Sequence, residues 1–520
     1  MASPGRPMWY ERTMELASLD TRTCYQALRT RDARFDGRFF TGVTTTGVFC
    51  RPVCPARTPL LRHCRFFAHA AAAQEAGYRP CLRCRPEAAP GTSPWLGTST
   101  TVARGLRLIG AGTSGPEAIP DLAARLGVGE RHLRRLFLRH LGASPHAVVH
   151  AQRVLFAKKL IDETALPMSA VALAAGFSSV RRFNDAMRTT YGRPPTALRR
   201  TRRDAVAAPD LSLKLAFRPP FDWEALLGFL GTRAIPGVEE VDSGVYRRTV
   251  RLPEDSGVLE VRRGPGANEL TATLRVACAP PHLFDCVARL RRLFDLEADP
   301  LAIATLLAAD ARLAPIVRRR PGLRVPGAWD GFELAVRAVL GQQVSVRAAR
   351  TLAARLVARH GEPVASPTPT LRALFPRPEA LAAADLTACG LTRARARTVS
   401  ALAVAVAAGD VALDGTADPE PTLATLRSLP GIGEWTAQYI ALRALRAPDA
   451  FPAGDLGLRR GYARIAVRPR GQRGRSRPPR TPAPASEADL RRVSESWRPW
   501  RAYAAIHLWT WEAEHGTVDR

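Results

Sequence analysis

The chain has 520 residues, of which 46% are hydrophobic, and a formal net charge of +29. This length is enough for three or four domains of roughly 100–200 residues each, and the positive charge favours a polyanionic partner, nucleic acid ahead of an anionic membrane. The sequence contains no apolar run of the roughly 20 residues that span a bilayer. It also lacks the apolar core of a signal peptide. The composition therefore excludes a membrane-spanning protein and indicates a cytoplasmic one.

Four cysteines near the N-terminus form two close pairs. Three residues separate Cys50 from Cys54, and two separate Cys81 from Cys84. Short turns of this kind each place two sulfurs on one edge of a tetrahedral zinc ion, and a reducing cytosol favours metal over disulfides. The spacing predicts one zinc ion held by four cysteines, and the alternative is four unrelated buried thiols. Two other cysteines of this segment are predicted to be core or spare thiols: Cys24 and Cys64.

The residues around the paired cysteines resemble a known family. Residues 44–57 (TTTGVFCRPVCPAR) and 77–86 (GYRPCLRCRP) are similar to the N-terminal domain of Ada-type methylphosphotriester repair proteins. The resemblance implies that Cys50 takes a methyl group irreversibly from a DNA phosphate. Zinc suits this role because it keeps the sulfur as the nucleophilic thiolate. Methylation would remove negative charge near the DNA, which suits a switch of DNA affinity. By position, two residues are candidate phosphate contacts: Thr46 and Arg57.

Residues 102–200 contain two helix-turn-helix patterns, at 119–137 and 168–183, joined by a predicted long helix at 146–162. This arrangement, with the ending FNDAMRTTYGRPP, resembles the AraC-type DNA-binding domain. Recognition helices are predicted at about 130–140 and 179–189. The arginines expected to face a groove are Arg131, Arg134, Arg181 and Arg182. For each of them the alternative is a solvated surface charge, because phosphate contacts outnumber base contacts.

Residues 211–325 alternate between apolar and polar side chains in three places, which predicts strands at 211–217, 258–262 and 270–276. Helices are expected near 223–230 and 281–296, and from residue 329 onward the chain is predicted to be mostly helical. Polar segments at 89–101 and 199–209 are predicted linkers.

A Pro-Gly-Ile-Gly hairpin opens a predicted helix in residues 429–439 (LPGIGEWTAQY). Backbone amides at Gly431 and Gly433, together with the helix N-terminus, can hold a DNA phosphate. Asp455 follows 22 residues after Gly433, within the sequence FPAGDLGL. With residues 329–345 and 497–509, these motifs resemble the helix-hairpin-helix DNA glycosylases of the 3-methyladenine glycosylase II (AlkA-type) subfamily. Residues 211–325 resemble the β-rich N-terminal domain of the same subfamily.

This second resemblance implies roles for individual residues. Asp455 becomes the catalytic carboxylate, which stabilises an oxocarbenium-like sugar while an alkylated base leaves. A cationic alkylated purine favours aromatic neighbours, and the implied base pocket is formed by Trp435, Tyr439 and Trp509. The alternative for each aromatic residue is ordinary helix core. Where the family often has an apolar wedge, this chain has Gln343, which is expected to plug the gap left by base flipping.

Two absences sharpen the predicted chemistry. No lysine follows Lys214, and Trp435 occupies the position of the lysine that strand-cutting relatives use, which predicts a monofunctional glycosylase. No cysteine follows Cys389, so the iron–sulfur cluster of some relatives is not expected, and the absence of a Pro-Cys-His motif excludes an alkylguanine methyltransferase domain.

Residues 461–485 carry seven arginines and no acidic residue, with many prolines and glycines. Such a composition cannot bury a core and predicts disorder. The stretch is either a basic loop that contacts DNA along its backbone or a segment translated from a shifted reading frame.

Together these patterns predict a multidomain α+β protein of four domains. They are a zinc methyl-acceptor domain at 20–88, an all-α double helix-turn-helix domain at 102–200, a β-rich domain at 211–325 and an all-α glycosylase domain at 326–520. The predicted function is alkylation repair and adaptive-response regulation in one monomeric chain, with alkylated and promoter double-stranded DNA as partners and RNA polymerase as a further candidate. Two alternatives remain: a regulator with an impaired glycosylase module, and a structural zinc protein without methyl transfer.

Overall fold

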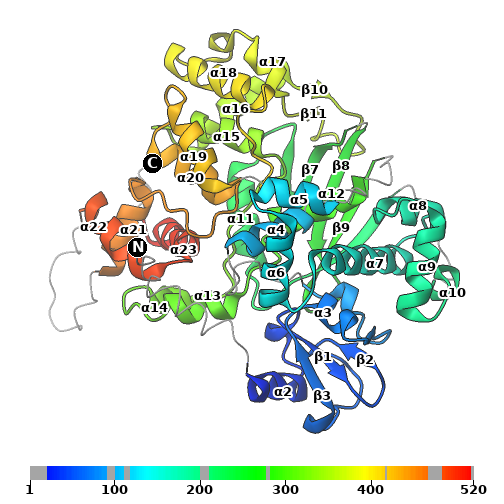
Figure 1. The fold of residues 1–520 in the computed structure, drawn as a ribbon. Helices are drawn as coiled ribbons and strands as arrows, with labels where there is room; N and C mark the ends of the chain where they lie inside the picture. The colour runs from blue at the N-terminus through cyan, green and yellow to red at the C-terminus, as the bar shows by residue number, and fades with distance from the viewer. Residues whose placement is uncertain are drawn as a thin grey trace. The chain divides into compact units, whose positions relative to one another are not determined.

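The computed structural model describes residues 20–90, 100–110, 118–199, 210–253, 255–276, 282–415, 418–466 and 483–516 (Figure 1). The chain forms two compact units. Unit 1 comprises Met1–Pro219, Pro236–Ala298 and Pro363–Leu374, and unit 2 comprises Pro220–Ile235, Asp299–Glu362 and Phe375–Arg520. None of the described helices combines the length and apolarity needed to cross a membrane.

Unit 1 begins with a small four-stranded sheet of order β3-β1-β2-β4. Its strands are β1 (Phe40–Val43), β2 (Val48–Cys50), β3 (Cys64–Phe67) and β4 (Arg79–Pro80), and its helices are α2 (Thr21–Thr30) and α3 (Ala70–Glu75). The rings of Phe40 and Phe49 pack edge to face at 5.8 Å in its core. Strands β2 and β4 run parallel, so the chain segments that follow them leave the sheet side by side.

Seven helices follow in unit 1: α4 (Thr100–Gly110), α5 (Ala118–Leu126), α6 (Glu130–Leu141), α7 (Pro145–Glu163), α8 (Met168–Ala174), α9 (Val180–Tyr191) and α10 (Pro195–Leu198). Helices are confirmed at both positions predicted for recognition helices, α6 and α9, and the predicted long connection is α7. Leu133 and Phe137 on α6, and Phe183 and Met187 on α9, are completely buried, because residues three and four apart share one helix face.

Helix α7 also carries two of the three lysines of the chain. Lys158 and Lys159 are buried, and each pairs with an acid one turn later: Lys158 Nζ lies 2.5 Å from Asp162 and Lys159 Nζ lies 2.7 Å from Glu163. The third, Lys214 on strand β5, keeps 51% of its side chain exposed.

The second sheet of unit 1 has five antiparallel strands in the order β5-β9-β8-β7-β6. They are β5 (Leu211–Ala216), β6 (Glu239–Asp242), β7 (Val245–Arg251), β8 (Ser256–Arg263) and β9 (Glu269–Arg275), with α12 (Leu283–Leu293) after them. In β9 alternate residues are buried, as the period of two predicts. The three predicted strands and the helix after them are confirmed, whereas β6 and β7 were not predicted. The predicted linkers lie largely outside the described residues.

Unit 2 is helical (Figure 1). Its helices are α11 (Trp223–Arg233), α13 (Pro300–Leu307), α14 (Ala314–Arg319), α15 (Gly331–Leu340), α16 (Val346–His360), α17 (Pro378–Ala382), α18 (Arg393–Ala407), α19 (Pro419–Ser428), α20 (Glu434–Arg443), α21 (Leu456–Ala466), α22 (Glu487–Ser494) and α23 (Arg501–His515). The predicted helical character of this part of the chain is confirmed.

The prediction that disorder begins at residue 461 was wrong for its first six residues, which continue helix α21. Tyr462 is buried with its ring 6.1 Å from that of Trp497. Gly461 allows close packing within this helix, because a Cβ there would lie 2.5 Å from the carbonyl oxygen of Leu508 on α23. Residues 467–482 of the predicted insert lie outside the described residues.

The buried face of α6 yields a stability prediction. Replacing Phe137 by Ala should lower the free energy of opening of the α4–α7 core by about 3–5 kcal/mol, because a large cavity remains. Leu138, one residue on, is 44% exposed, so the matched variant Leu138→Ala should change it by less than about 0.5 kcal/mol. Amide hydrogen exchange in α6 and α7 measures both effects, and equal losses would contradict this packing.

Candidate functional sites

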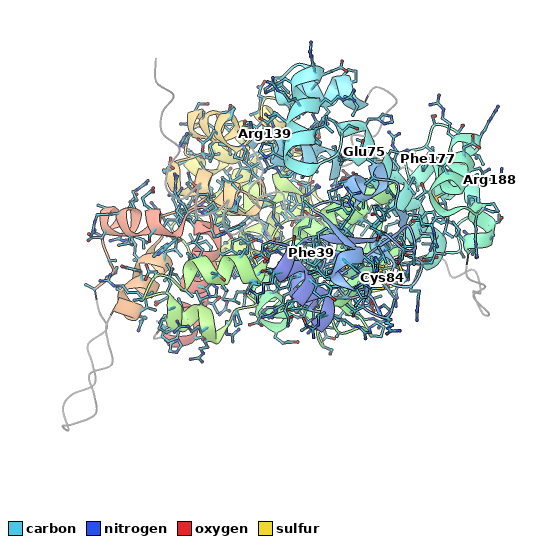
Figure 2. The ribbon with its side chains drawn as sticks, turned by 60° about the horizontal axis from the view of Figure 1, so that its bottom comes forward. Phe39, Glu75, Cys84, Arg139, Phe177 and Arg188 are labelled. Carbon is cyan, nitrogen blue, oxygen red and sulfur yellow. The ribbon has the colours of Figure 1, made fainter. Side chains whose placement is uncertain are left out.

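The four paired cysteines lie together in the first domain. Cys50 ends β2, Cys54 follows a tight turn, and Cys81 and Cys84 follow β4. Their Sγ atoms all lie within 4.8 Å of one another. The parallel pairing of β2 with β4 explains this: the backbone N–H of Cys81 donates to the carbonyl of Phe49 at 3.0 Å, which places one pair beside the other. The spacing-based prediction of a four-cysteine centre is confirmed, and Figure 2 marks Cys84 within it.

The donor set fits zinc. Four thiols converge without a disulfide among them, and four cysteine sulfurs at one point form a closed tetrahedral zinc site. The backbone N–H of Arg51 donates to Cys84 Sγ at 3.3 Å, a contact that favours the thiolate. Cys50 is half-buried, whereas the other three ligands are buried. Cys50 is thus the least buried residue of the four as a whole, although all four lie buried within the cluster.

The turn between the first two cysteines is held by an ion pair. The Arg51 guanidinium donates to Asp36 from Nε at 2.9 Å and also from a terminal nitrogen. Its other terminal nitrogen donates to the carbonyl of Cys84 at 3.0 Å. Arg51 therefore connects both cysteine turns to the domain core, a role that the sequence analysis missed.

The remaining predicted residues of this domain lie at the surface or in its core. Thr46 and Arg57 are exposed, as phosphate contacts need to be. Cys24 is buried outside the metal cluster, and burial raises the pKa of its thiol to about 12, as expected of an unreactive core cysteine. Cys64 is half-buried and also lies outside the cluster.

Helices α6 and α9 present arginines outward. The four predicted residues are all exposed: Arg131, Arg134, Arg181 and Arg182. Helix α9 begins at a capping residue, since Ser179 Oγ accepts the backbone N–H of Arg182 at 3.2 Å. Further arginines on the same helices are also exposed, and Figure 2 labels two that the sequence analysis did not single out: Arg139 and Arg188.

In unit 2, the predicted hairpin joins α19 to α20. Gly431 adopts a φ of 79°, and a Cβ there would lie 2.1 Å from Thr398 Oγ1 on α18, so only glycine fits this turn. Gly433 is the N-cap of α20 and supplies no side-chain cap. Within the part of the chain that the structure describes, no capping side chain satisfies the first backbone N–H groups of α20, which can bind a phosphate oxygen.

The carboxylate of Asp455 accepts three hydrogen bonds from separate segments. Trp509 Nε1 donates to Oδ1 at 2.8 Å, the backbone N–H of Leu458 donates to Oδ1 at 2.9 Å, and Trp435 Nε1 donates to Oδ2 at 2.9 Å. Asp455 thus caps α21 while α20 and α23 each contribute an indole. Gly457 permits this, because a Cβ there would lie 3.1 Å from Asp455 Oδ1 and 3.2 Å from the Trp509 ring.

The three predicted pocket residues form one aromatic cluster beside this carboxylate. Trp435 and Tyr439, one helical turn apart on α20, stack at 5.6 Å with an interplanar angle of 17°. Trp509 meets Tyr439 edge to face at 6.0 Å. All three side chains are partly accessible. They can therefore contact a base inserted next to Asp455, as the sequence analysis expected.

A group of arginines behind Tyr439 was not predicted. Arg443 Nη1 donates to the Tyr439 hydroxyl at 2.8 Å, and Arg443 also donates to two backbone carbonyls, those of Pro326 at 2.6 Å and Gly327 at 3.1 Å. Burial alone would raise the pKa of Tyr439, but the charges of Arg443 and Arg233 outweigh burial and lower it below its ordinary value. The spacing of Tyr439 and Arg443, four residues apart on one helix, is the signal that could have revealed the pair.

Gln343 lies in the turn between α15 and α16. It is exposed and adopts a φ of 55°, unusual for a residue other than glycine. The neighbouring Val344 is 37% exposed and supplies apolar surface at the same turn. The predicted plug therefore has an accessible position with an apolar neighbour.

Family models match four successive parts of the chain: the metal binding domain of Ada at residues 23–87, a helix-turn-helix domain at 122–201, the AlkA N-terminal domain at 212–330 and the HhH-GPD superfamily of base excision DNA repair proteins at 336–475. Escherichia coli DNA-3-methyladenine glycosylase 2 is 36% identical over 298 residues, 57% of this chain and 95% of the relative. The solved 3-methyladenine DNA-glycosylase from Archaeoglobus fulgidus is similar in fold, at 22% identity and a TM-score of 0.50, over 59% of this chain and 99% of that structure.

Fold and sites together define a DNA repair protein in which an Ada-type metal domain and a helix-turn-helix region precede a base excision glycosylase. Mycobacterium tuberculosis has a protein described as a probable bifunctional transcriptional activator/DNA repair enzyme AlkA, and it is 44% identical over 496 residues, 94% of this chain and 96% of the relative. The chain belongs to this AlkA family of bifunctional activators and repair enzymes.

The indole donors around Asp455 can be tested by a substitution that keeps the ring. Trp509→Phe removes one hydrogen bond to a charged group, which is worth about 1.5–3 kcal/mol, so base excision should slow by about 10- to 100-fold.

The control is Trp511→Phe on the same helix, because the indole N–H of Trp511 has no hydrogen-bond partner among the described residues. This variant should retain the wild-type rate. Equal rates for Trp509→Phe and wild type in single-turnover base release would show that the hydrogen bond is dispensable.

Proposed function

We propose that this chain excises alkylated bases of the 3-methyladenine type with Asp455 as its catalytic carboxylate, and transfers methyl groups from DNA methylphosphotriesters to Cys50. The observation that carries the first activity is the fixed Asp455 carboxylate between two indole N–H donors beside an aromatic cluster. The half-buried Cys50 in a four-cysteine cluster supports the second. We propose four domains, at residues 20–88, 102–200, 211–325 and 326–520.

Excision begins with a flipped alkylated purine among the three aromatic side chains. Such a base is cationic and electron-poor, so it gains from contact with aromatic faces. The bond between the base and C1′ breaks with its electron pair leaving on the base, and the sugar develops positive charge. Asp455, held in place by its three donors, stabilises that charge. Water then adds to C1′ and loses a proton.

The predicted glycosylase segment, residues 326–520, contains no lysine that could form a Schiff base, because Lys214 is the last lysine of the chain. The proposed enzyme therefore leaves the DNA strand intact after the base departs. Trp435, at the position where strand-cutting relatives have lysine, donates to Asp455 in this chain.

At the first domain, zinc bound by the four cysteines would keep them as thiolates at neutral pH. The Cys50 Sγ attacks the methyl carbon of a phosphotriester, and the bond from that carbon to the phosphate oxygen breaks with its electron pair on the oxygen. The product is a thioether at Cys50 and an ordinary phosphodiester. Thr46 and Arg57, both exposed, are the proposed phosphate contacts.

DNA binding by the helix-turn-helix and glycosylase regions gives these reactions their substrate. We propose that exposed arginines on α6 and α9 contact promoter DNA, and that RNA polymerase is a partner of the activator function. The protein would act as a monomer at the nucleoid in the cytoplasm, with the repair activities and regulation in one chain.

The Asp455 assignment predicts a large and selective loss. Asp455→Asn should slow release of 3-methyladenine from methylated DNA by at least about 100- to 1,000-fold, because the stabilising charge is removed. The control Asp489→Asn replaces an exposed acid on α22 and should match wild type. Undiminished release by Asp455→Asn would overturn the assignment, and a wild-type chain without release would favour a regulator with an impaired glycosylase module.

The Cys50 assignment predicts a stoichiometric adduct. After exposure to DNA carrying methylphosphotriesters, mass spectrometry of the peptides spanning residues 50–84 should show one added methyl group, located at Cys50. Cys64→Ser leaves the four-cysteine cluster intact and should accept the same single methyl group. A chain that holds zinc but gains no methyl group would instead be a structural zinc protein.

A further inference from the structure

The turn that carries Gln343 is tied to α20 by the residue before it. The side-chain amide of Gln342 donates both of its hydrogens, to the carbonyl of Gly431 at 2.8 Å and to Thr436 Oγ1 at 2.9 Å. Gly431 lies in the hairpin and Thr436 in the first turn of α20. One side chain therefore bridges the turn at 341–345 and the candidate phosphate-binding segment.

The main chain of Gln342 is held as well. Its N–H donates to the carbonyl of Val339 at 3.2 Å, and its carbonyl accepts from Arg395 Nη2 at 2.6 Å. This carbonyl belongs to the peptide that leads into Gln343. Because rotation of that peptide sets the direction of Gln343, these contacts hold the following residue in its left-handed conformation.

The hairpin is fixed from its other side. Gly431 sits directly on Thr398 of α18, the helix that also carries Arg395. Thus α18 contacts the hairpin through Thr398 and the turn at 341–345 through Arg395. Gln342 connects that turn directly to the hairpin. Gln343, by contrast, is exposed at the tip of this assembly.

The same helical turn of α20 serves the reaction centre. Thr436 follows Trp435, whose indole donates to Asp455 Oδ2. The amides at the start of α20 can bind a phosphate. Gln342 thereby sets the position of the exposed plug relative to both the phosphate-binding amides and the carboxylate.

We propose that Gln342 is a positioning residue for base flipping, which locks the turn bearing Gln343 to the first turn of α20. Gln342 does not touch the reacting atoms; it acts through Gln343. When a DNA phosphate is bound by the α20 amides, Gln343 then lies at a fixed distance from that phosphate. Gln343 can therefore insert into the duplex at the position from which the flipped base enters the site beside Asp455. This inference rests on the proposed glycosylase function.

The test compares a lesion that must be flipped with one that is already unpaired. Gln342→Met keeps the length of the side chain and removes its amide, and Gln342→Glu keeps the shape but places an acceptor against the carbonyl of Gly431. Single-turnover excision of 7-methylguanine is measured opposite cytosine and in a one-nucleotide bulge. Both variants should lose about tenfold or more on the paired lesion, because small misplacements are costly. They should lose less than about threefold on the bulged lesion, which needs little unstacking.

A matched control removes a side-chain hydrogen bond elsewhere in unit 2. Thr305→Val on α13 loses an exposed bond of 2.8 Å to the carbonyl of Leu301 and should leave both rates unchanged. Equal losses on paired and bulged lesions would show that Gln342 is merely structural, and unchanged rates for Gln342→Met would show that it positions nothing. Either result overturns the inference.

A second measurement does not depend on bond cleavage. Wild type and Gln342→Met are each combined with Asp455→Asn, and 2-aminopurine beside the lesion reports unstacking by its fluorescence. The Gln342→Met chain should flip the lesion several-fold less at saturating protein, with an unchanged salt dependence of binding, since the number of phosphate contacts stays the same. Equal fluorescence would overturn the positioning role. A wild-type chain that flips but never cleaves would instead count against the proposed function alone.

Discussion

The hydrogen bonds that fix the Asp455 carboxylate constrain most of unit 2. Two indoles reach it from α20 and α23, and the carboxylate itself caps α21, so these three helices must converge at one point. Convergence requires small residues where the helices approach: Gly457 leaves room for Trp509, and Gly461 lets α21 lie against α23. The hairpin before α20 likewise requires glycine at position 431, because a side chain at Gly431 would overlap Thr398. A carboxylate held by donors from separate elements is organised before substrate arrives, which is the condition for electrostatic stabilisation of a developing cation.

Unit 1 is stabilised by different interactions. Its metal domain is too small to bury a large core, so four cysteines and the Arg51–Asp36 ion pair hold the loops beyond the short strands. The helix-turn-helix region relies on apolar faces instead, with completely buried residues such as Leu133 and Phe183 on the inner sides of α6 and α9. This division leaves the outer sides of both helices free to carry arginine, whose planar guanidinium can contact phosphate through two parallel hydrogen bonds.

Much of this organisation could be predicted because the decisive signals are local. The Cys50–Cys54 and Cys81–Cys84 spacings, the alternation in β9 and the Gly431–Gly433 hairpin each lie within a few residues. What sequence reasoning missed depends on distant partners: neither the indole bonds to Asp455 nor the bridge from Gln342 to Thr436 has a local pattern. The wrong boundary at residue 461 has the same origin: the composition of the stretch predicts that it buries no core, whereas the neighbouring α23 packs closely against α21 at Gly461. Strand β7 was overlooked because its burial departs from strict alternation.

The burial of Lys158 and Lys159 has a practical consequence. Both ammonium groups are enclosed in ion pairs on α7, and the chain contains one other lysine, Lys214, whose side chain is half exposed on β5. Of the three lysine side chains, Lys214 is therefore the one open to amine-directed reagents in the native protein, beside the α-amino group at the start of the chain, which reacts with the same reagents near neutral pH. A fluorophore or a surface tether coupled to a lysine side chain will sit at β5, away from the arginines of α6 and α9 along the sequence. Lysine coupling thus gives one defined side-chain attachment point, without an engineered cysteine that would compete with the thiols of the protein.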